Sequence, residues 1–314
     1  MQSPEGGGAQ VADMSVAVIG AGPSGLVAAK ELLEGGFQRV TIFERNTHGV
    51  GGLWNQEGGH TWPRMRTNLS KFTCCFSDFA WEDGDGDGED APSQHFPLAA
   101  QVQEYLERYC QHFGLHKHLR LARDVTSVRL LPDGRRFELR WRPTAADSST
   151  ACADEVVEHF DKVVVASGVF SRGCVPSELP GCEQLLAVGK AMHSSAFKDA
   201  SAFRGRHVMV VGASFSGYEV AAELAAEGVA VTHVVNRPCW VLPRYLPGRR
   251  DGVPIDLVLY RRDRRRSTPK DPWEAARRRH RFLSQAAGNP GASCAELRVD
   301  EPLGAGAAGA AAPP

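Results

Sequence analysis

The stretch VAVIGAGPSGLVAAKELLEGGFQRVTIFERNTHGVGGLW, residues 16–54, decides the fold of this chain. It opens with a short apolar, β-branched run, residues 15–19, which is typical of a buried parallel strand. A glycine-rich turn follows, then a run with helical spacing of apolar residues at 24–34, and then a second strand-like run at 39–43. This order predicts the strand–turn–helix–strand unit that holds a dinucleotide.

The turn carries the pattern G-x-G-x-x-G, in which each glycine has a separate physical task. The first makes the tight bend, the second lets the backbone approach a pyrophosphate, and the third lets helix and strand pack closely. The start of the helix adds free N–H groups and a positive dipole end. An acid stands 19 positions after the third glycine, where a carboxylate accepts hydrogen bonds from ribose hydroxyls. We therefore predict a nucleotide site, rather than a glycine turn without ligand, at Gly20, Ala21, Gly22, Pro23, Ser24, Gly25 and Glu44.

The same pattern occurs again in the second half of the chain, as an internal repeat. HVMVVG at 207–212 predicts a strand, GASFSG at 212–217 a second glycine turn, and the residues beyond it a helix at 216–227 and a strand at 229–235. Nineteen positions after the last glycine of this turn stands Asn236, followed by Arg237, in place of the acid. A carboxylate would repel a 2′-phosphate, whereas an Arg clamps it with two hydrogen bonds. The first unit therefore suits FAD or NAD, and the second suits NADPH at Gly212, Ser214, Ser216, Gly217 and Arg237.

The bulk composition excludes several classes of protein. The chain has 314 residues, 42% hydrophobic and 23% charged, which predicts a globular protein of about two domains. A net charge of −1 argues against nucleic acid or an anionic membrane as the partner. Eight cysteines without any C-x-x-C argue against a disulfide scaffold, structural zinc or a redox disulfide, and favour the cytoplasm. No apolar run has the length of a membrane span.

Between the two units the chain has two segments that suit a bound cofactor. Three glycines at 49–52 fit a tight turn or a close approach to a ligand, and Leu53 and Trp54 follow them. Trp54 covers a cofactor ring in one interpretation and packs in the core in the other. Asn68 carries an amide that both donates and accepts, although an Asn that bonds its own turn is the more common case. The acidic run 82–90 fits a solvated loop better than a calcium loop.

The remaining patterns complete an α/β fold. Residues 97–114 predict an amphipathic helix, and strand-like runs at 119–130, 135–142 and 155–165 predict a small β-meander with a hairpin at Asp133-Gly134. Residues 161–166 are apolar enough to rejoin the central parallel sheet and end at Ser167-Gly168. Acids at Asp263, Asp271 and Glu274 interrupt the Arg-rich run 261–281, so a solvated face or weak help for a phosphate-rich cofactor is favoured over nucleic acid.

These motifs together resemble the flavin-containing monooxygenases over residues 15–297. The resemblance rests on GAGPSG, ERNTHGVGGLW, TNLSK followed by FSDF, DKVVVASG, GKAMHSSAF and VVGASFSG. The family pattern F-x-G-x-x-x-H-x-x-x-F/Y is met by Gly189, His193 and Phe197, with Ala187 in place of its first Phe. Ser167 stands where the family usually has Thr.

The resemblance implies an FAD domain at 14–180 with an NADPH domain at 181–288 inserted into it. Composition predicts a disordered tail at 1–13 and a low-complexity tail at 289–314. The resemblance also implies that NADPH reduces FAD, which takes up O2 as a C4a-hydroperoxide and passes oxygen to the nitrogen or sulfur of a small nucleophile. It places Asn68 at the oxygenated flavin, with Thr67 and Leu69 beside the cofactors, and makes His193 a hinge or packing residue between the two domains. Association with further copies of the chain stays open.

Family members are longer and return to finish the FAD domain, whereas this chain becomes low-complexity after about Leu297. The alternative function is therefore a truncated, impaired flavoprotein, which is either an uncoupled NADPH oxidase or a non-catalytic nucleotide-binding remnant.

Overall fold

The computed structural model describes residues 11–81, 95–144, 155–170, 173–175, 180–236, 241–247 and 252–259. The expectations for residues 1–10, the acidic run 82–90, Arg237, the Arg-rich run and the C-terminal tail lie outside these residues. The expected disorder is wrong for residues 11–13, because the Asp13 carbonyl accepts a hydrogen bond from Arg39 (3.2 Å) and Met14 N–H donates to the Val11 carbonyl (3.2 Å).

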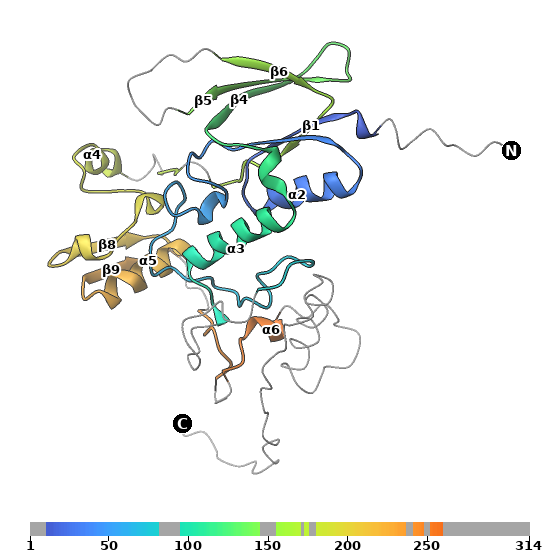
Figure 1. Ribbon diagram of the computed structural model, residues 1–314. Coiled ribbons are helices and arrows are strands. Elements are labelled where there is room, and N and C mark those ends of the chain that lie inside the picture. Colours follow the sequence, from blue (N-terminus) through green and yellow to red (C-terminus); the bar gives the residue numbers. More distant parts are fainter. Residues whose placement is uncertain are drawn as a thin grey trace, which may run out of the picture.

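The first unit is built around a parallel sheet, as predicted (Figure 1). Strand β1 (Ser15–Ile19) leads through a turn into helix α2 (Pro23–Glu34), and the chain returns along β2 (Arg39–Phe43). The strand order is β3-β2-β1-β7, with β3 at Leu119–Arg120 and β7 at Lys162–Val165. Since β1 lies between β2 and β7 in parallel register, its apolar middle is fully buried, as is typical of a central parallel strand. The predicted α/β, Rossmann-like fold is confirmed.

The main core lies between this sheet and helix α3 (Ala99–His112). The apolar side of α3 carries Val102, Tyr105, Leu106 and Tyr109, all of which are buried. These side chains pack against the buried face of α2 and against Phe79 and other aromatic residues of the segment that precedes α3. Burying one such side chain contributes about 1.5–3 kcal/mol, so α3 is held firmly and serves as the platform for the loops described below.

The β-meander consists of β4 (Arg123–Leu130), β5 (Phe137–Pro143) and β6 (Val156–Phe160), all antiparallel. The run 155–165 divides at Asp161 into β6 in the meander and β7, which pairs in parallel with β1, so the prediction that residues 161–166 rejoin the central parallel sheet is confirmed. Asp161 Oδ2 accepts hydrogen bonds from the N–H (2.7 Å) and the hydroxyl (2.8 Å) of Ser15, which brings the chain into line with β1. The run 119–130 divides similarly at Ala122, whose φ is +55°.

The second unit repeats the first on a smaller scale. It contains β8 (His207–Val211), α5 (Phe215–Ala226) and β9 (Ala230–Val234), with β8 and β9 in parallel. Trp62, from the first half of the chain, packs edge-on against Phe197 (centroids 5.2 Å apart) in the core of this unit. Short helical elements complete the described fold: η1 (Gly52–Trp54), η3 (Leu115–His118), α4 (Cys182–Ala187), η4 (Ser194–Ala196), η5 (Ser201–Phe203) and α6 (Asp256–Leu259).

After the second unit the chain comes back to the first. Residues of α6 and the segment before it contact the stretch that follows Asn68, 186 positions earlier in the sequence. The second unit thus lies between two stretches that touch the first, which agrees with the predicted insertion. Within the described part of the chain, no helix has both the length and the apolar character needed to cross a bilayer.

Candidate functional site

The first glycine turn is held rigidly between β2 and the end of β7. Gly20 has a φ of +102°, and its N–H donates to the carbonyl of Phe43 at 2.8 Å. A Cβ added at Gly20 would lie 2.5 Å from the carbonyl oxygen of Ala166, and one added at Gly25 would lie 1.8 Å from the carbonyl oxygen of Gly20. The two outer glycines therefore have the predicted tasks of bending the chain and of letting helix and strand approach.

Glu44 lies beside this turn, at the end of β2. Its side chain is buried, with Oε2 accepting from the Ala21 N–H at 2.7 Å and Oε1 from the Asn46 N–H at 2.8 Å. The carboxylate thus braces the backbone of the glycine turn. A carboxylate has about four acceptor positions, so these two bonds leave capacity for ribose hydroxyls.

The N-terminal end of α2 is open. Gly22 is its N-cap residue and Pro23 its first residue, and Ser24 is exposed. Among the described residues, no side chain caps this end and no acid stands in the first turn. Since the first N–H groups of a helix have no partner within the helix and carry a partial positive charge, this end suits a phosphate.

A second turn, residues 49–54, packs directly against the first. The Gly51 N–H donates to the Ala21 carbonyl at 3.0 Å, and a Cβ on Gly52 would lie 3.0 Å from the Cα of Gly22. Gly49, Gly51 and Gly52 all have positive φ, so the tight turn expected from the sequence is present. Leu53 is 40% exposed, whereas Trp54 packs against the main core, in line with the packing interpretation.

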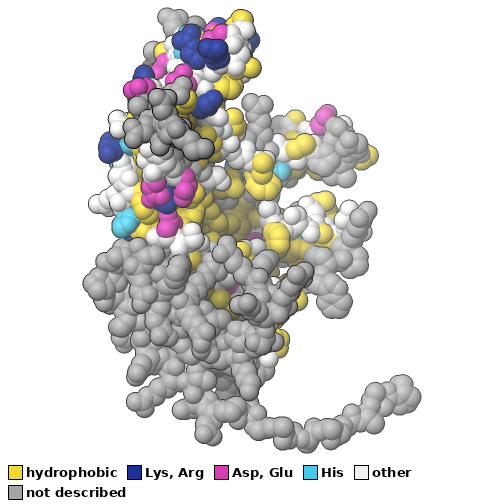
Figure 2. Space-filling view, turned by 90° about the vertical axis from the view of Figure 1, so that its right-hand side faces the viewer, with side chains coloured by type: hydrophobic (Ala, Val, Ile, Leu, Met, Phe, Trp, Pro, Cys, Tyr) yellow, Lys and Arg dark blue, Asp and Glu magenta, His cyan; other side chains and the backbone are white. Residues whose placement is uncertain are grey.

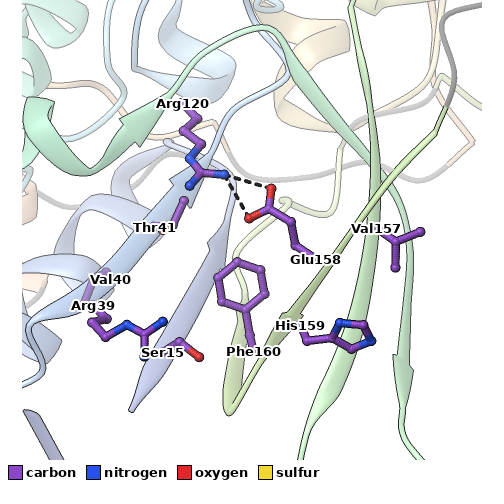
Figure 3. A pocket seen from close by; sticks show the side chains of 9 residues that line it. All are labelled: Ser15, Arg39, Val40, Thr41, Arg120, Val157, Glu158, His159 and Phe160. Atoms are coloured by element: carbon purple, nitrogen blue, oxygen red, sulfur yellow. Dashed lines mark hydrogen bonds and ion pairs between the residues drawn. The ribbon is translucent and has the colours of Figure 1, made fainter. Parts of the chain in front are cut away.

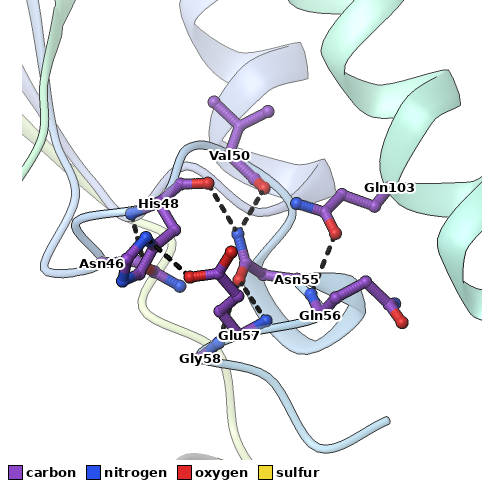
Figure 4. A network of polar contacts seen from close by, with 8 residues as sticks. All are labelled: Asn46, His48, Val50, Asn55, Gln56, Glu57, Gly58 and Gln103. Atoms are coloured by element: carbon purple, nitrogen blue, oxygen red, sulfur yellow. Dashed lines mark hydrogen bonds and ion pairs between the residues drawn. The ribbon is translucent and has the colours of Figure 1, made fainter. Parts of the chain in front are cut away.

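Asn55 holds this second turn together and was missed by sequence reasoning (Figure 4). It is fully buried; its Nδ2 donates to the Val50 carbonyl (3.2 Å), and its Oδ1 accepts from the N–H groups of Glu57 (3.0 Å) and Gly58 (2.9 Å). Next to it, the Gln56 N–H donates to Gln103 of α3 at 2.9 Å. An Asn followed two residues later by Glu-Gly-Gly is a signal for an Asx turn, which would have identified it.

The segment with Asn68 docks on the same end of α3. The Thr67 N–H donates to the Pro97 carbonyl at 2.9 Å, and the Ala99 N–H donates to the Met65 carbonyl at 2.8 Å. Asn68 is exposed, Leu69 is half-buried, and no hydrogen bond of the Asn68 side chain is found within the described residues. Thr67 is 3% exposed, and its buried Oγ1 has no partner among the described groups. The structure therefore brings both loops to one helix end and presents unused polar groups there.

The second glycine turn has the same geometry as the first. The Gly212 N–H donates to the Val234 carbonyl at 2.9 Å, and a Cβ on Gly217 would lie 2.3 Å from the Gly212 carbonyl oxygen. Ser214 is the N-cap of α5 without a side-chain cap bond, and Ser216 is exposed. His233, which the sequence did not single out, places Nε2 at 2.8 Å from the Gly212 carbonyl oxygen and supports the turn.

The end of the second strand needs one correction. Phe43 and Val234 play equivalent parts, since each accepts from the first glycine of its turn, so Val235 and not Asn236 corresponds to Glu44. The connection from α5 to β9 is shorter by one residue than that from α2 to β2, and a count along the sequence does not detect this. Neither Val235 nor Asn236 is an acid, so the position equivalent to Glu44 lacks a carboxylate in either case. Arg237 lies outside the described residues.

Other chemistries find little support around these turns. Burial raises the pKa of Cys74 to about 11, so this thiol is protonated at neutral pH and unsuited to nucleophilic catalysis. No cluster of metal-ligating side chains occurs in the part of the chain that the structure describes. His193 Nδ1 accepts from the Ser195 N–H (3.1 Å), which caps η4 and agrees with the expected structural role.

A cavity of about 490 Å³ lies along β2, between the parallel sheet and β6 of the meander (Figure 3). Ser15 and Arg39 line it at the first residues of β1 and β2, whereas the glycine turn and Glu44 follow the last residues of these strands. Arg120 and Glu158 close one side of it by a paired hydrogen bond (2.8 and 3.0 Å). Ligands of parallel α/β sheets bind at the carboxyl ends of the strands, so this cavity is separate from the nucleotide sites.

Comparisons with known proteins agree with this geometry. The model of the family "FMO-like: Flavin-binding monooxygenase-like" matches residues 13–268. A mouse protein named dimethylaniline monooxygenase [N-oxide-forming] 4 is 33% identical in an alignment over 253 residues, and the match covers 78% of this chain and 42% of the mouse protein. The chain thus spans less than half the length of this curated relative.

Two solved structures are similar over most of the chain. S-allyl-L-cysteine S-oxygenase from Allium sativum has a TM-score of 0.58 at 26% identity, covering 75% of this chain and 54% of the other. Cyclohexanone monooxygenase from Rhodococcus sp. Phi1, bound to NADP+, has a TM-score of 0.53 at 25% identity, covering 73% and 39%. With the family model matching well over half of its residues, the chain belongs to the flavin-binding monooxygenase-like family.

Proposed function

We propose that this chain binds FAD at the first glycine turn and NADPH at the second, and that it takes part in transferring one oxygen atom of O2 to the nitrogen or sulfur of a small molecule. The observation that carries the proposal is the contact between the two turns at Gly22 and Gly52, with the Glu44 carboxylate fixed against Ala21. Together they form a bare-backbone surface at the open end of α2. Figure 2 shows another side of the molecule, where hydrophobic side chains gather around its middle.

The groups at this surface fit FAD. The N-terminal end of α2 suits the pyrophosphate, and the remaining acceptor positions of Glu44 suit ribose hydroxyls. A methyl group at Gly52 would meet Gly22 at 3.0 Å, so the two backbones approach each other without side chains between them. Gly20, Ala21, Pro23, Ser24 and Gly25 shape the turn, and Leu53, with its exposed side chain, lies beside it.

Thr67 and Asn68 supply the polar groups that a flavin ring requires. The orphan Oγ1 of Thr67 costs free energy while it is unpaired, since a buried polar group without a hydrogen bond costs about 1–3 kcal/mol. A cofactor that bonds it relieves this cost. Asn68 presents an amide without a protein partner among the described residues, able to donate and to accept. Bound FAD would supply the redox chemistry, while these residues orient it and hold it away from water.

The second turn fits the phosphates of NADPH. Gly212, Ser214, Ser216 and Gly217 surround the open N-terminal end of α5, and no carboxylate follows β9 to repel a 2′-phosphate. We assign the 2′-phosphate to Arg237. The names of the mouse relative and of the Allium enzyme support nitrogen and sulfur, respectively, as the acceptor of oxygen.

Titration of the chain with FAD, followed by flavin fluorescence, tests the proposal. We expect saturable binding in the wild type and weaker binding in Gly22→Ala, because the added methyl group occupies the surface where the backbone would approach the pyrophosphate. The methyl group itself fits the fold, at 3.6 Å from the Gly52 Cα. Wild-type protein that leaves FAD free in solution would refute the assignment.

Coenzyme choice tests the second site. Arg237→Ala should lower the preference for NADPH over NADH by about tenfold or more, because one charge-assisted pair is lost. The ratio of the two dissociation constants, measured by titration of the FAD-loaded chain, checks this. A ratio equal to that of the wild type removes Arg237 from the site.

The role of Asn68 is tested by the fate of oxygen. Asn68→Asp should lower the yield of oxygenated amine or sulfide per NADPH and raise hydrogen peroxide, because the substitution puts a negative charge and no donor at the flavin. The measurement is the ratio of product to peroxide at equal NADPH consumption. A ratio that stays at the wild-type value contradicts the role.

A second candidate function is an NADPH oxidase that releases peroxide. The end of β7 and the residues after it are open to solvent on the side next to the first glycine turn, with Val169 86% and Phe170 70% exposed. Water access at this point would favour peroxide over oxygen transfer. Stoichiometric peroxide without product, across several amines and sulfides, would support this function over the first.

A further inference from the structure

The carboxylate of Asp256 is buried against the turn that follows Asn68. Asp256 is 2% exposed, and its Oδ2 accepts from the N–H of Ser70 (3.0 Å), from the hydroxyl of Ser70 (2.8 Å) and from the hydroxyl of Thr73. A buried carboxylate needs hydrogen-bond donors, and Oδ2 finds three of them here, whereas the buried Oδ1 has no partner among the described groups. All three belong to residues 70–73, directly after Thr67 and Asn68.

The 70–73 turn depends on this carboxylate. The end of the turn is closed by backbone hydrogen bonds from the N–H groups of Thr73 (3.0 Å) and Cys74 (2.8 Å) to the Ser70 carbonyl. The N–H at its beginning, that of Ser70, donates to Asp256. An acidic side chain in this place acts as a helix N-cap does, although here it comes from 186 positions along the chain.

The segment that carries Asp256 is itself anchored at both ends. The buried Val253 packs against Phe72 of the turn. At the other end, Arg244 Nη2 bonds Glu219 of α5 at 3.4 Å, and the Ile255 N–H donates to the Arg244 carbonyl at 2.9 Å. The described residues 244–247 and 252–256 therefore connect the second unit with the turn next to Asn68.

We propose that Asp256 is a positioning residue, which fixes the 70–73 turn and through it Thr67 and Asn68 in the geometry that the flavin site requires. The inference rests on the proposed function for the role of Thr67 and Asn68. Asp256 itself bonds only Ser70 and Thr73 among the described residues and acts through them. Asp256 follows the second unit in the sequence, whereas the other residues of the proposed flavin site come from the first half of the chain.

A matched control exists in the same chain. Asp161 accepts from the N–H (2.7 Å) and hydroxyl (2.8 Å) of Ser15, the same two kinds of donor that Ser70 offers to Asp256, but it lies at the opposite end of the parallel sheet. Asp161→Ala removes equivalent bonds without touching the turn. Asp256→Asn serves as the conservative variant, because an amide oxygen still accepts from Ser70.

Hydrogen exchange of the 314-residue chain measures the hold on the turn. In Asp256→Ala we expect the backbone of residues 67–74 to exchange about tenfold faster or more, since hydrogen bonds to charged groups are among the strongest in proteins. Asp256→Asn should restore most of the protection, and Asp161→Ala should leave it unchanged. If Asp256→Ala does not fold, Ser70→Ala removes only the hydroxyl donor and should give a smaller change of the same sign. Unchanged exchange at 67–74 in the folded variants overturns the inference.

FAD affinity, measured on the same proteins, tests the connection to the cofactor. Asp256→Ala should bind FAD at least about fivefold more weakly than the wild type, with Asp161→Ala equal to the wild type. Equal affinities for all three proteins, together with faster exchange of the turn in Asp256→Ala, overturn the positioning role. Failure of the wild type itself to bind FAD refutes the proposed function instead, and the exchange experiment distinguishes the two cases.

Discussion

An alanine at position 25 would put a methyl group into the contact between α2 and the first glycine turn. Its Cβ would lie 1.8 Å from the carbonyl oxygen of Gly20 and 2.9 Å from the carbonyl carbon, whereas real Cβ atoms stay beyond 3.0 Å. The helix must therefore withdraw from the turn by more than about 1 Å. The obstacle is backbone whose N–H is already bonded to Phe43, so no flexible side chain can give way.

The expected loss of stability follows from two opposing effects. Overpacking of this kind costs about 3 kcal/mol, at the upper end of the usual range. Alanine is the better helix former and returns at most about 1 kcal/mol. We therefore expect Gly25→Ala to lower the free energy of unfolding by about 2 kcal/mol, which corresponds to about 4–8 °C in Tm.

Urea and thermal unfolding, followed by circular dichroism, measure the effect. Gly22→Ala is the matched control, because Gly22 has an ordinary φ of −76° and its added Cβ meets its nearest neighbour at 3.6 Å. We expect the control to lose no more than about 1 kcal/mol, since alanine at the N-cap position is poorer than glycine but meets no close neighbour. If Gly25→Ala is as stable as Gly22→Ala, the close approach of α2 to the turn is not what holds this unit together.

Two further predictions concern buried polar groups. Tyr105→Phe should lower the free energy of unfolding by about 1–3 kcal/mol, because the Tyr105 hydroxyl donates to the Phe79 carbonyl (2.6 Å) and accepts from the Phe76 N–H (2.8 Å). Tyr109→Phe should be neutral or stabilising, since the buried Tyr109 hydroxyl has no partner among the described residues. Equal urea midpoints for the two variants would contradict this prediction. Burial lowers the pKa of His95 to about 4, so the unfolded chain takes up a proton near pH 6.5 while the native state does not, and stability should fall as the pH drops from 6.5 to 4. Urea unfolding at about pH 7.5 and about pH 4.5 should show a smaller acid loss in His95→Phe, and an identical loss would exclude His95 as its source.

Much of the nucleotide-binding architecture could be predicted from the sequence because it depends on local chemistry. The glycines of both turns, the apolar β1 strand and the acid at the end of β2 are adjacent in sequence, and their spacing is set by the length of a helix and the width of a turn. The hairpin at Asp133-Gly134 was predictable for the same reason, since Asp133 bonds the N–H groups of the next residues.

Boundaries that depend on distant partners were not predictable. The return of residues 161–166 to the parallel sheet was predictable from their apolar character, but the hydrogen bond between Ser15 and Asp161, 146 positions apart, which brings β7 into line with β1, was not. The residue equivalent to Glu44 in the second unit is Val235, because a one-residue difference in a loop shifts the register without changing the motif.

By itself, the sequence determined the fold class, the two glycine turns and the family, since each depends on residues close together along the chain. Only the tertiary structure decided that Asp256 closes the turn beyond Asn68. Asp256 is an ordinary polar residue in the sequence, and it acquires this role from burial, which makes every hydrogen bond that it forms costly to lose.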